Sequence, residues 1–209
     1  MSDVLLLVDI QNDFLPGGAL AVPEGDTVVP IANRLIPAFD TVIASQDWHP
    51  ANHLSFAEQH PGHQAFEVTE VDGVEQILWP VHCVQNSAGA SFASGLDIAG
   101  IDHVVRKGED RRIDSYSAFY DNGHRKATGL AETLRDLDAG RLFVMGLAAD
   151  VCVKYTVLDA LAEGFATTLI VDGVRGVDMT PGDTETAIET MQAAGAACLT
   201  SEALLDSGR

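Results

Sequence analysis

The feature of this sequence that most constrains its fold is a regular alternation of short apolar runs with helical patterns. Several runs are too apolar to have a solvent-facing side, which is typical of parallel strands at the centre of a sheet. The predicted strands are Val4–Asp9, Thr41–Ser45, Asp102–Lys107, Arg141–Met145, Thr167–Asp172 and Ala196–Thr200. The predicted helices are Thr27–Ala38, Ala127–Ala139, Val151–Glu163 and Pro181–Ala194. This alternation implies right-handed crossovers, so we predict an α/β fold, a three-layer α/β/α sandwich around a mainly parallel sheet of about six strands.

The segment between residues 46 and 101 does not follow this alternation. It is long, rich in His, Pro and Gly, and weakly periodic. Loops of this length inside a compact domain are usually functional. The chain has 209 residues and shows no internal repeat or linker that would divide it. We therefore predict a single domain over residues 1–209.

Charge and cysteine content argue against several classes of protein. A formal net charge of −19 disfavours nucleic acid as a partner, because phosphate binding needs clustered Lys and Arg. The cysteines Cys83, Cys152 and Cys198 have no paired spacing, which argues against a disulfide framework and favours a reducing, cytoplasmic location. The first apolar run is short and ends at Asp9, so it lacks the length and basic region of a signal or membrane segment. We expect no membrane partner.

Three reactive side chains follow or end predicted strands, namely Asp9, Lys107 and Cys152. In open α/β sheets, ligands bind beyond the carboxyl ends of the strands. A free cysteine has a pKa near ~8.5 and needs help to become a thiolate. Asp9 could take its proton, Lys107 could orient that carboxylate and offset its charge, and the start of the next helix would favour the thiolate. Asp150 is predicted to be the N-cap of that helix, where its charge competes with a thiolate.

Each of these residues also has a purely structural interpretation. A lone cysteine among apolar residues is usually a small buried hydrophobe, which suits Cys198. An aspartate after a strand commonly caps or forms a loop, and a lysine there is usually solvated. The helix-start position of Cys152 favours a nucleophile instead, and the three side chains at one sheet edge together favour a catalytic site.

A second group of candidate residues lies in the loop region. Asp47 and His49 in "SQDWHP" are two residues apart, so in an extended segment their side chains leave the same face and could reach one ion. His82 in "LWPVHC" can supply a third ligand and leave positions open for water or substrate. One carboxylate and two imidazoles suit zinc, with iron or manganese as alternatives. We therefore predict a metal-binding loop region at about 46–101, with His53 as an outer-shell or additional ligand.

Other cofactor motifs fail on inspection. The stretch "DIQNDF" begins with EF-hand-like spacing, but Phe14 stands where a calcium loop needs glycine. No P-loop and no dinucleotide glycine fingerprint occurs in the sequence. The chain therefore gives no indication of a nucleotide cofactor.

Five blocks of the sequence, in this order, resemble the nicotinamidase family of the cysteine-hydrolase, isochorismatase-like superfamily. They are "LLLVDIQNDFLPGGAL", "SQDWHPANHLSF", "LWPVHCVQ", "RKGEDRRIDSYSAFYDN" and "GLAADVCVKYTVLDAL". The similarity covers nearly the whole chain. The first and last blocks are widespread in the superfamily, whereas the metal-loop blocks and "DSYSAFYDN" are narrower and favour nicotinamidase.

The resemblance implies a role for each candidate residue. The residues that match the catalytic triad are Asp9, Lys107 and Cys152, and those that match the metal ligands are Asp47, His49 and His82. The amides of Ala148 and Cys152 match the oxyanion hole, with a cis peptide bond expected at Leu147–Ala148. The residues that match the ring-contacting wall of the pocket are Phe14, Leu20, Trp79 and Tyr116.

The function implied by the resemblance is hydrolysis of nicotinamide to nicotinate and ammonia, through a thioester on the cysteine, in NAD salvage. Pyrazinamide is expected to be a further substrate, and a homo-oligomer is left open. Val151 and Ala149 depart from the family, which often has an aromatic residue and a threonine there, so the breadth of ring recognition is open. The alternatives are another amidase or carbamoyl hydrolase of the superfamily, a metallohydrolase in which Cys152 only packs, and a non-catalytic metal-binding protein.

Overall fold

The computed structural model of this protein describes residues 2–207. Within this range, six strands form one fully parallel sheet in the spatial order β5-β2-β1-β6-β7-β8. The strands are β1 (Ser2–Val8), β2 (Thr41–Asp47), β5 (His103–Lys107), β6 (Ala139–Leu147), β7 (Ala166–Arg175) and β8 (Ala197–Leu199). The predicted parallel sheet is confirmed, with a strand at each of the predicted positions.

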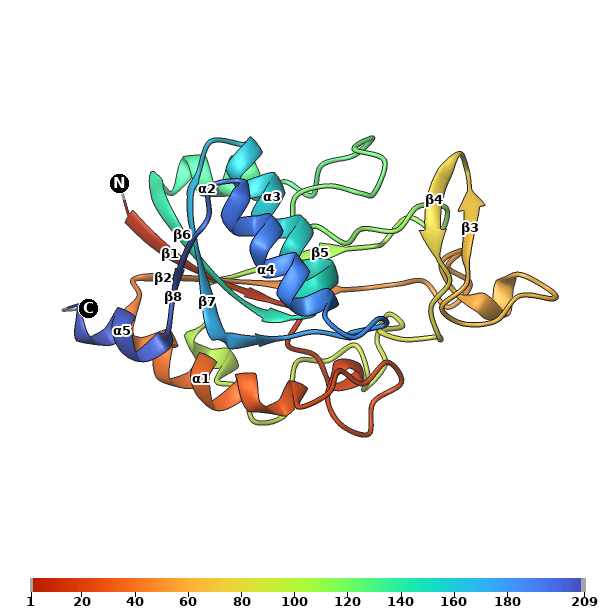
Figure 1. Ribbon diagram of the computed structural model, residues 1–209, viewed down its shortest axis with the longest axis horizontal. Coiled ribbons are helices and arrows are strands. Elements are labelled where there is room, and N and C mark those ends of the chain that lie inside the picture. Colours follow the sequence, from red (N-terminus) through yellow and green to blue (C-terminus); the bar gives the residue numbers. More distant parts are fainter. Residues whose placement is uncertain (1, 208–209) are drawn as a thin grey trace.

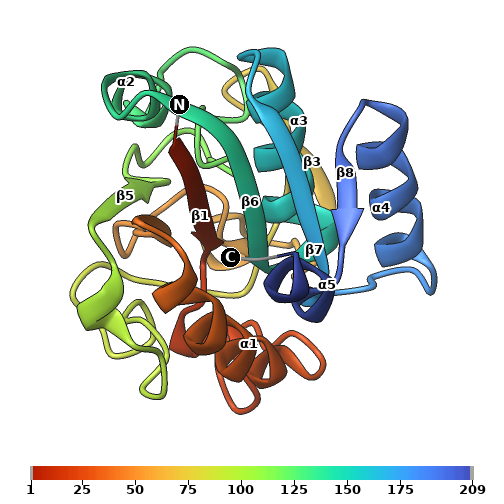
Figure 2. The same ribbon diagram turned by 90° about the vertical axis from the view of Figure 1, so that its left-hand side faces the viewer.

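Helices cover both faces of the sheet, as Figures 1 and 2 show. One face carries α1 (Val28–Leu35) and α5 (Ser201–Asp206), and the other carries α2 (Leu130–Asp136), α3 (Lys154–Ala162) and α4 (Asp183–Ala193). Side chains of β1 alternate between the layers: Leu5 and Leu7 belong to the core cluster of α1, and Leu6 to that of α2, α3 and α4. Residues 4–8 of β1 are apolar and buried on both faces of the sheet, which explains why they show no period-two pattern.

Two elements were not predicted. A hairpin of β3 (Val68–Val71) and β4 (Val74–Ile77) lies within the loop region, at the end of the molecule beyond the main sheet (Figure 1). Its strands are four residues each and largely exposed, so they lack the apolar run that marks a buried strand. The second is α5, which is six residues long and too short to give a clear helical period.

The strand order determines which segments meet at the sheet edge. From β1 the chain moves outward to β2 and β5 on one side, and later to β6, β7 and β8 on the other. The order therefore reverses between β1 and β6, and ligands bind at such a switch point in open α/β sheets. Asp9 directly follows β1, and the segment that contains Cys152 follows β6. Among residues 2–207, no helix has the length and apolar character needed to span a membrane.

Candidate active site

The structure brings Asp9, Lys107 and Cys152 together at the carboxyl ends of β1, β5 and β6. The ammonium Nζ of Lys107 lies 2.9 Å from Asp9 Oδ2 and 3.6 Å from Cys152 Sγ. All three side chains are buried, although Lys and Asp are seldom buried unless they are paired. The structural alternatives of a solvated lysine and a loop-capping aspartate therefore do not describe these residues.

The electrostatics of this trio keep the thiol protonated and raise the proton affinity of the neighbouring carboxylate. Burial raises the pKa of Cys152 well above its usual range, and the charge on Lys107 offsets this only in part. Burial likewise raises the pKa of Asp9, against the opposing charge of Lys107. Burial lowers the pKa of Lys107, but the carboxylates of Asp47 and Asp9 outweigh it and raise that pKa well above the usual range. The site thus holds a neutral thiol beside a fixed positive charge and a carboxylate with raised proton affinity.

Ser45 is a part of this site that the sequence did not reveal. Its hydroxyl donates to Asp9 Oδ1 at 2.6 Å and accepts from the Asp9 backbone N–H at 3.2 Å. Ser45 is fully buried on β2, next to β1 in the sheet. The first bond holds Oδ1 of the carboxylate, and Asp9 Oδ2 is the oxygen that faces Lys107 Nζ.

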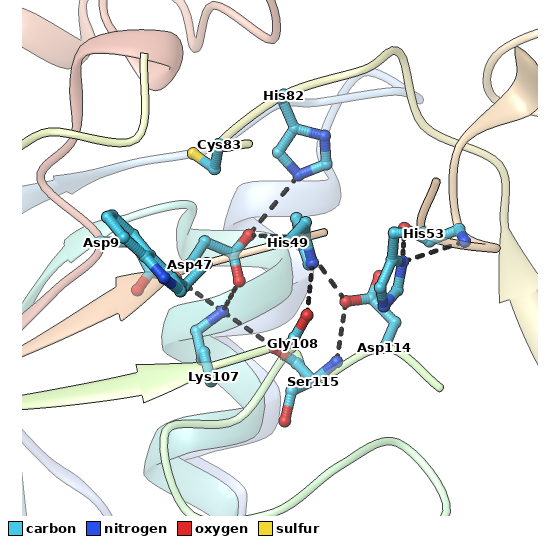
Figure 3. A network of polar contacts seen from close by, with 12 residues as sticks. Asp9, Asp47, His49, His53, His82, Cys83, Lys107, Gly108, Asp114 and Ser115 are labelled. Carbon is cyan, nitrogen blue, oxygen red and sulfur yellow. Dashed lines mark hydrogen bonds and ion pairs between the residues drawn. The ribbon is translucent and has the colours of Figure 1, made fainter. Parts of the chain in front are cut away.

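Asp47, His49 and His82 form a compact group that we call the metal group. Asp47 Oδ2 lies 3.2 Å from His49 Nε2 and 3.5 Å from His82 Nε2, and one ligand atom of each residue lies within 4.8 Å of the others (Figure 3). The other ring nitrogens are taken by backbone carbonyls: His49 Nδ1 bonds Gly108 O at 2.9 Å, and His82 Nδ1 bonds Pro80 O at 2.8 Å. Such second contacts orient imidazoles whose Nε2 faces a metal.

The chemistry of this donor set fits a divalent cation. One carboxylate and two imidazoles are common zinc ligands and leave a coordination position open. Burial lowers the pKa of His49, but Asp47 outweighs it and raises that pKa to about 9. Burial raises the pKa of Asp47, but Lys107 and His49 together bring it well below its usual value. The Asp47 carboxylate therefore stays ionised, and His49 must release its proton before its Nε2 can bind a metal.

A second possible ligand group overlaps the first and consists of His49, His53 and Asp114. Asp114 Oδ1 lies 3.9 Å from His49 Nε2, and the rings of His49 and His53 have centroids 4.5 Å apart. Burial lowers the pKa of His53 to about 4, so its imidazole is neutral and able to act as a ligand. His53 was predicted to be an outer-shell or additional ligand, whereas Asp114 was missed as a candidate.

The four predicted wall residues line one small cavity together with the nucleophile candidate. This cavity of about 30 Å³ is called the pocket, and its lining includes Phe14, Leu20, Trp79 and Tyr116. Cys152 and Ala148 also line the pocket. Two members of the metal group, Asp47 and His82, complete this part of its lining. Val151, which stands where the family often has an aromatic residue, also lines the pocket. The pocket wall at this position is therefore aliphatic.

The segment after β6 differs from the prediction. Residues Ala149–Val153 form a π-helical turn, and α3 begins only at Lys154, so Cys152 lies in the turn and not in the first turn of α3. The peptide bond Leu147–Ala148 is cis, as the resemblance implied. The predicted N-cap role of Asp150 is wrong: no side chain caps this turn, and Asp150 accepts from the N–H groups of Val177 and Asp178 at 2.9 and 2.8 Å.

Comparison with known proteins identifies the family. The isochorismatase domain matches residues 3–203. This chain belongs to the isochorismatase family. Within it, the chain is 54% identical over 200 residues to the nicotinamidase of Escherichia coli K12, a match that covers 94% of this chain and 93% of that protein.

Two solved structures of related proteins have the same fold. A nicotinamidase/pyrazinamidase of Acinetobacter baumannii superposes with a TM-score of 0.94 at 44% identity, covering 97% of this chain and 98% of that one. The pyrazinamidase of Pyrococcus horikoshii, solved in complex with zinc, superposes with a TM-score of 0.78 at 36% identity. The match covers 96% of this chain and 99% of that one.

Proposed function

We propose that this protein is a nicotinamidase, an amidohydrolase that converts nicotinamide and water to nicotinate and ammonia. The observation that carries the proposal is the pocket, where Cys152, the metal group and a mainly apolar wall meet around one small space. The aromatic and aliphatic side chains of its lining, beside a thiol, are chemically suited to a flat ring that carries one carboxamide. The 54% identity to the Escherichia coli nicotinamidase supports the same substrate.

We propose the following course for the acylation half of the reaction. As Cys152 Sγ attacks the carboxamide carbon, its proton passes to Asp9, whose raised pKa favours accepting it. The carbonyl oxygen gains negative charge, and we assign its stabilisation to the backbone amides of Ala148 and Cys152, as the family resemblance implies. A donor of this kind contributes on the order of 2.7–4 kcal/mol in other enzymes. The C–N bond then breaks, Asp9 returns the proton to the leaving nitrogen, and ammonia departs from a thioester.

Hydrolysis of the thioester completes the cycle. Water attacks the acyl carbon and Asp9 accepts one of its protons. The S–C bond then breaks, Asp9 returns that proton to sulfur to restore the thiol, and the product acid loses its remaining proton to solvent and leaves as nicotinate. Lys107 is charged throughout, since its ammonium contacts Asp9 Oδ2 at 2.9 Å and Asp47 Oδ1 at 2.7 Å. It offsets the negative charge that builds on sulfur and on Asp9.

Asp47, His49 and His82 would hold the divalent metal, for which we propose zinc because the donor set suits it. When bound, the ion supplies a Lewis acid that a pyridine nitrogen can coordinate. Phe14, Leu20, Trp79 and Tyr116 would contact the ring and fix its orientation, which places the carboxamide beside Cys152. We further propose that the enzyme acts in the cytoplasm, in NAD salvage, and that pyrazinamide is a second substrate.

An ammonia-release assay on nicotinamide, pyrazinamide and benzamide tests this proposal. We expect Cys152→Ala to lower kcat on nicotinamide by at least about 10³-fold. Cys198→Ala is the matched control, because Cys198 lies on the edge strand β8 outside the pocket, and it should keep full activity. Retained activity in Cys152→Ala would instead favour attack by metal-activated water.

Benzamide tests the role of the ring nitrogen. It has the ring size and carboxamide of nicotinamide but no nitrogen in the ring, so we expect much slower turnover. Equal turnover of benzamide and nicotinamide would contradict recognition of the pyridine nitrogen. Hydrolysis of other amides together with little activity on nicotinamide would favour the alternative amidase or carbamoyl hydrolase.

A further inference from the structure

Gln76 is a buried polar residue on an otherwise peripheral hairpin. Within residues 68–77, all of which the structure describes, Val71 and Gln76 are the buried positions, and Gln76 is only 3% exposed. Among the described residues, the hairpin pairs with no strand of the main sheet, although Ile77 at its end packs against the core cluster of α1. A buried amide on such an element needs hydrogen-bond partners.

The partners of Gln76 are residues of the candidate active site. Its amide Nε2 lies within hydrogen-bond distance of three acceptors, which share its two N–H hydrogens: the backbone oxygen of Ile77 at 2.6 Å, Asp114 Oδ2 at 3.2 Å and the Tyr116 hydroxyl at 3.2 Å. Asp114 and Tyr116 both line the pocket. Burial raises the pKa of Tyr116 above its usual range, so the phenol remains neutral beside the amide. Gln76 thus connects the hairpin to two side chains of the pocket at once.

The three consecutive residues Asp114, Ser115 and Tyr116 reach different parts of the site. Asp114 Oδ1 accepts from the backbone N–H of Ser115 at 2.7 Å and faces His49 Nε2 at 3.9 Å, as Figure 3 shows. The backbone oxygen of Ser115 accepts from Lys107 Nζ at 2.8 Å. The Tyr116 ring packs edge-on against Trp79. The orientation of this short segment therefore affects the metal group, the lysine and the pocket wall together.

An amide is chemically suited to this position. Asp114 is buried and acidic, and Oδ2 needs a donor. A lysine or arginine would supply one, but its charge would cancel the negative charge that draws a cation to His49 and Asp114. A carboxylate would face Asp114 as a like charge. The neutral Nε2 of Gln76 donates to Asp114 and leaves its charge in place.

We propose that Gln76 is a positioning residue of the active site, which holds Asp114 toward the metal group and Tyr116 toward the ring of the substrate. The hairpin β3–β4 is then a functional part of the site and acts through this one side chain. This inference rests on the proposed function for its substrate, but not for its effect on metal binding. Because both partners contribute to binding, loss of the amide acts on KM more than on kcat.

The test compares Gln76→Met with wild type. Methionine keeps the length and volume of glutamine but has no donor to offer. We expect KM for nicotinamide to rise roughly 3–10-fold, the range that one or two lost hydrogen bonds produce, with kcat changed less than about twofold. Turnover of 5-methylnicotinamide relative to nicotinamide should rise, because a mobile Tyr116 tolerates a larger ring. Glu75→Gln, on the exposed face of the same strand, is the control and should match wild type.

A double-mutant cycle with Tyr116→Phe separates positioning from general destabilisation. If Gln76 acts through the Tyr116 hydroxyl, the two substitutions together should raise KM by less than the product of their separate effects. Tyr116→Phe keeps the ring, so it also tests the contact if Gln76→Met does not fold. Independent, multiplicative effects, or a KM in Gln76→Met within twofold of wild type, would overturn the proposal.

Zinc titration of the metal-free proteins by calorimetry gives a readout that needs no turnover. We expect Gln76→Met to bind Zn²⁺ roughly 3–10-fold more weakly than wild type, since Asp114 loses its donor and its orientation. Failure of wild type to release ammonia from nicotinamide would overturn the proposed function alone. Unchanged Zn²⁺ affinity in a folded Gln76→Met would overturn the role of Gln76 in orienting Asp114, whatever the substrate.

Discussion

Gly108 constrains the position of His49 in the metal group. It directly follows β5, adopts a φ of +68°, and accepts a hydrogen bond on its carbonyl from His49 Nδ1. A Cβ atom at this position would lie 2.3 Å from His49 Cε1 and 2.6 Å from His49 Nδ1. Glycine is therefore required at this position for two reasons: the backbone has a positive φ, and the His49 imidazole lies too close for a side chain.

We predict that Gly108→Ala displaces His49 and weakens Zn²⁺ binding by about 10–100-fold, the range seen when an outer contact of a ligand is lost. The matched control is Gly62→Ala, at a φ of +92° with no atom within 4 Å of the new Cβ. In the control, alanine is strained by the positive φ but does not clash with a histidine ring. The Gly62→Ala variant should therefore bind Zn²⁺ like wild type. Calorimetric titration measures both variants, and equal affinities would show that the clash does not matter.

Asp159 on α3 provides a pH-dependent contribution to stability away from the pocket. Burial raises its pKa above the model-compound value of 3.8, and a hydrogen bond from Ser117 and the nearby His124 only partly oppose this. A carboxyl group with a raised pKa in the folded state binds a proton more tightly there than in the unfolded chain. The free energy of unfolding therefore falls as pH rises from about 3.8 through the folded-state pKa.

We predict that Asp159→Asn raises the free energy of unfolding at pH 7, where the buried carboxylate is ionised. The amide oxygen of asparagine can still accept from Ser117. The advantage over wild type should shrink as pH falls and disappear below pH 3.8, where the aspartate is protonated in both states. Urea denaturation at several pH values measures this. Glu189→Gln, at an exposed position of α4, should show no such trend, and a pH-independent gain for Asp159→Asn would refute the assignment.

At the scale of elements, the turn after β6 is tied to the loop after β7 by one side chain. The Asp150 carboxylate accepts from two backbone N–H groups, those of Val177 and Asp178. Val177 lines the pocket together with residues of the turn that carries Cys152. The contact thus fixes two walls of the pocket relative to each other.

We predict that Asp150→Ala lowers the free energy of unfolding by about 2–4 kcal/mol, because it leaves two partly buried amides without acceptors. Asp150→Asn keeps one acceptor oxygen and should lose about half as much. Asp206→Ala, at an exposed position near the end of α5, is the control and should stay within about 0.5 kcal/mol of wild type. Urea unfolding provides the measurement, and equal stabilities of Asp150→Ala and the control would contradict the assigned contact.

The elements that could be predicted from sequence are those whose residues lie in the central sheet. Residues 4–8 of β1 and 142–147 of β6 are buried and contain no charged or polar side chain, because helices cover both faces of the sheet, and this pattern can be recognised from the sequence alone. The hairpin has a mixed exposure pattern on four-residue strands, so its local signal is too weak to detect. The N-cap prediction for Asp150 failed because the π-helical turn carries its carboxylate to a loop 27 residues away.

The residues of the candidate site that could be predicted from sequence are likewise those tied to the strands of the central sheet. Asp9 and Lys107 adjoin the ends of strands, so the rule for parallel sheets located them. Ser45 and Gln76 were missed because their roles depend on which strand or loop lies opposite them. Asp114 reaches His49 from a segment 65 positions later in the chain, and spacing alone does not encode such a contact.

At the scale of the whole molecule, the dominant feature is an excess of acidic residues. The chain has 31 Asp and Glu against 12 Lys and Arg. Surface ion pairs such as Arg141–Asp3 and Arg125–Asp72 neutralise some of this charge locally. Across the hairpin, Glu70 and Glu75 stand directly opposite each other as like charges. Net repulsion of this kind disfavours the compact state relative to the expanded chain.

We predict that the free energy of unfolding increases as NaCl is raised from 0.01 to 1 M, since the screening length falls from about 30 Å to about 3 Å. Exposed ion pairs lose strength over the same range, but each contributes only about 0–1 kcal/mol. The double variant Glu70→Lys and Glu189→Lys changes the net charge from −19 to −15, because each replacement adds two positive units at an exposed site. It should be more stable than wild type at low salt and show a smaller salt dependence. Urea denaturation at each salt concentration tests this, and equal salt slopes for the two proteins would mean that general repulsion does not limit stability.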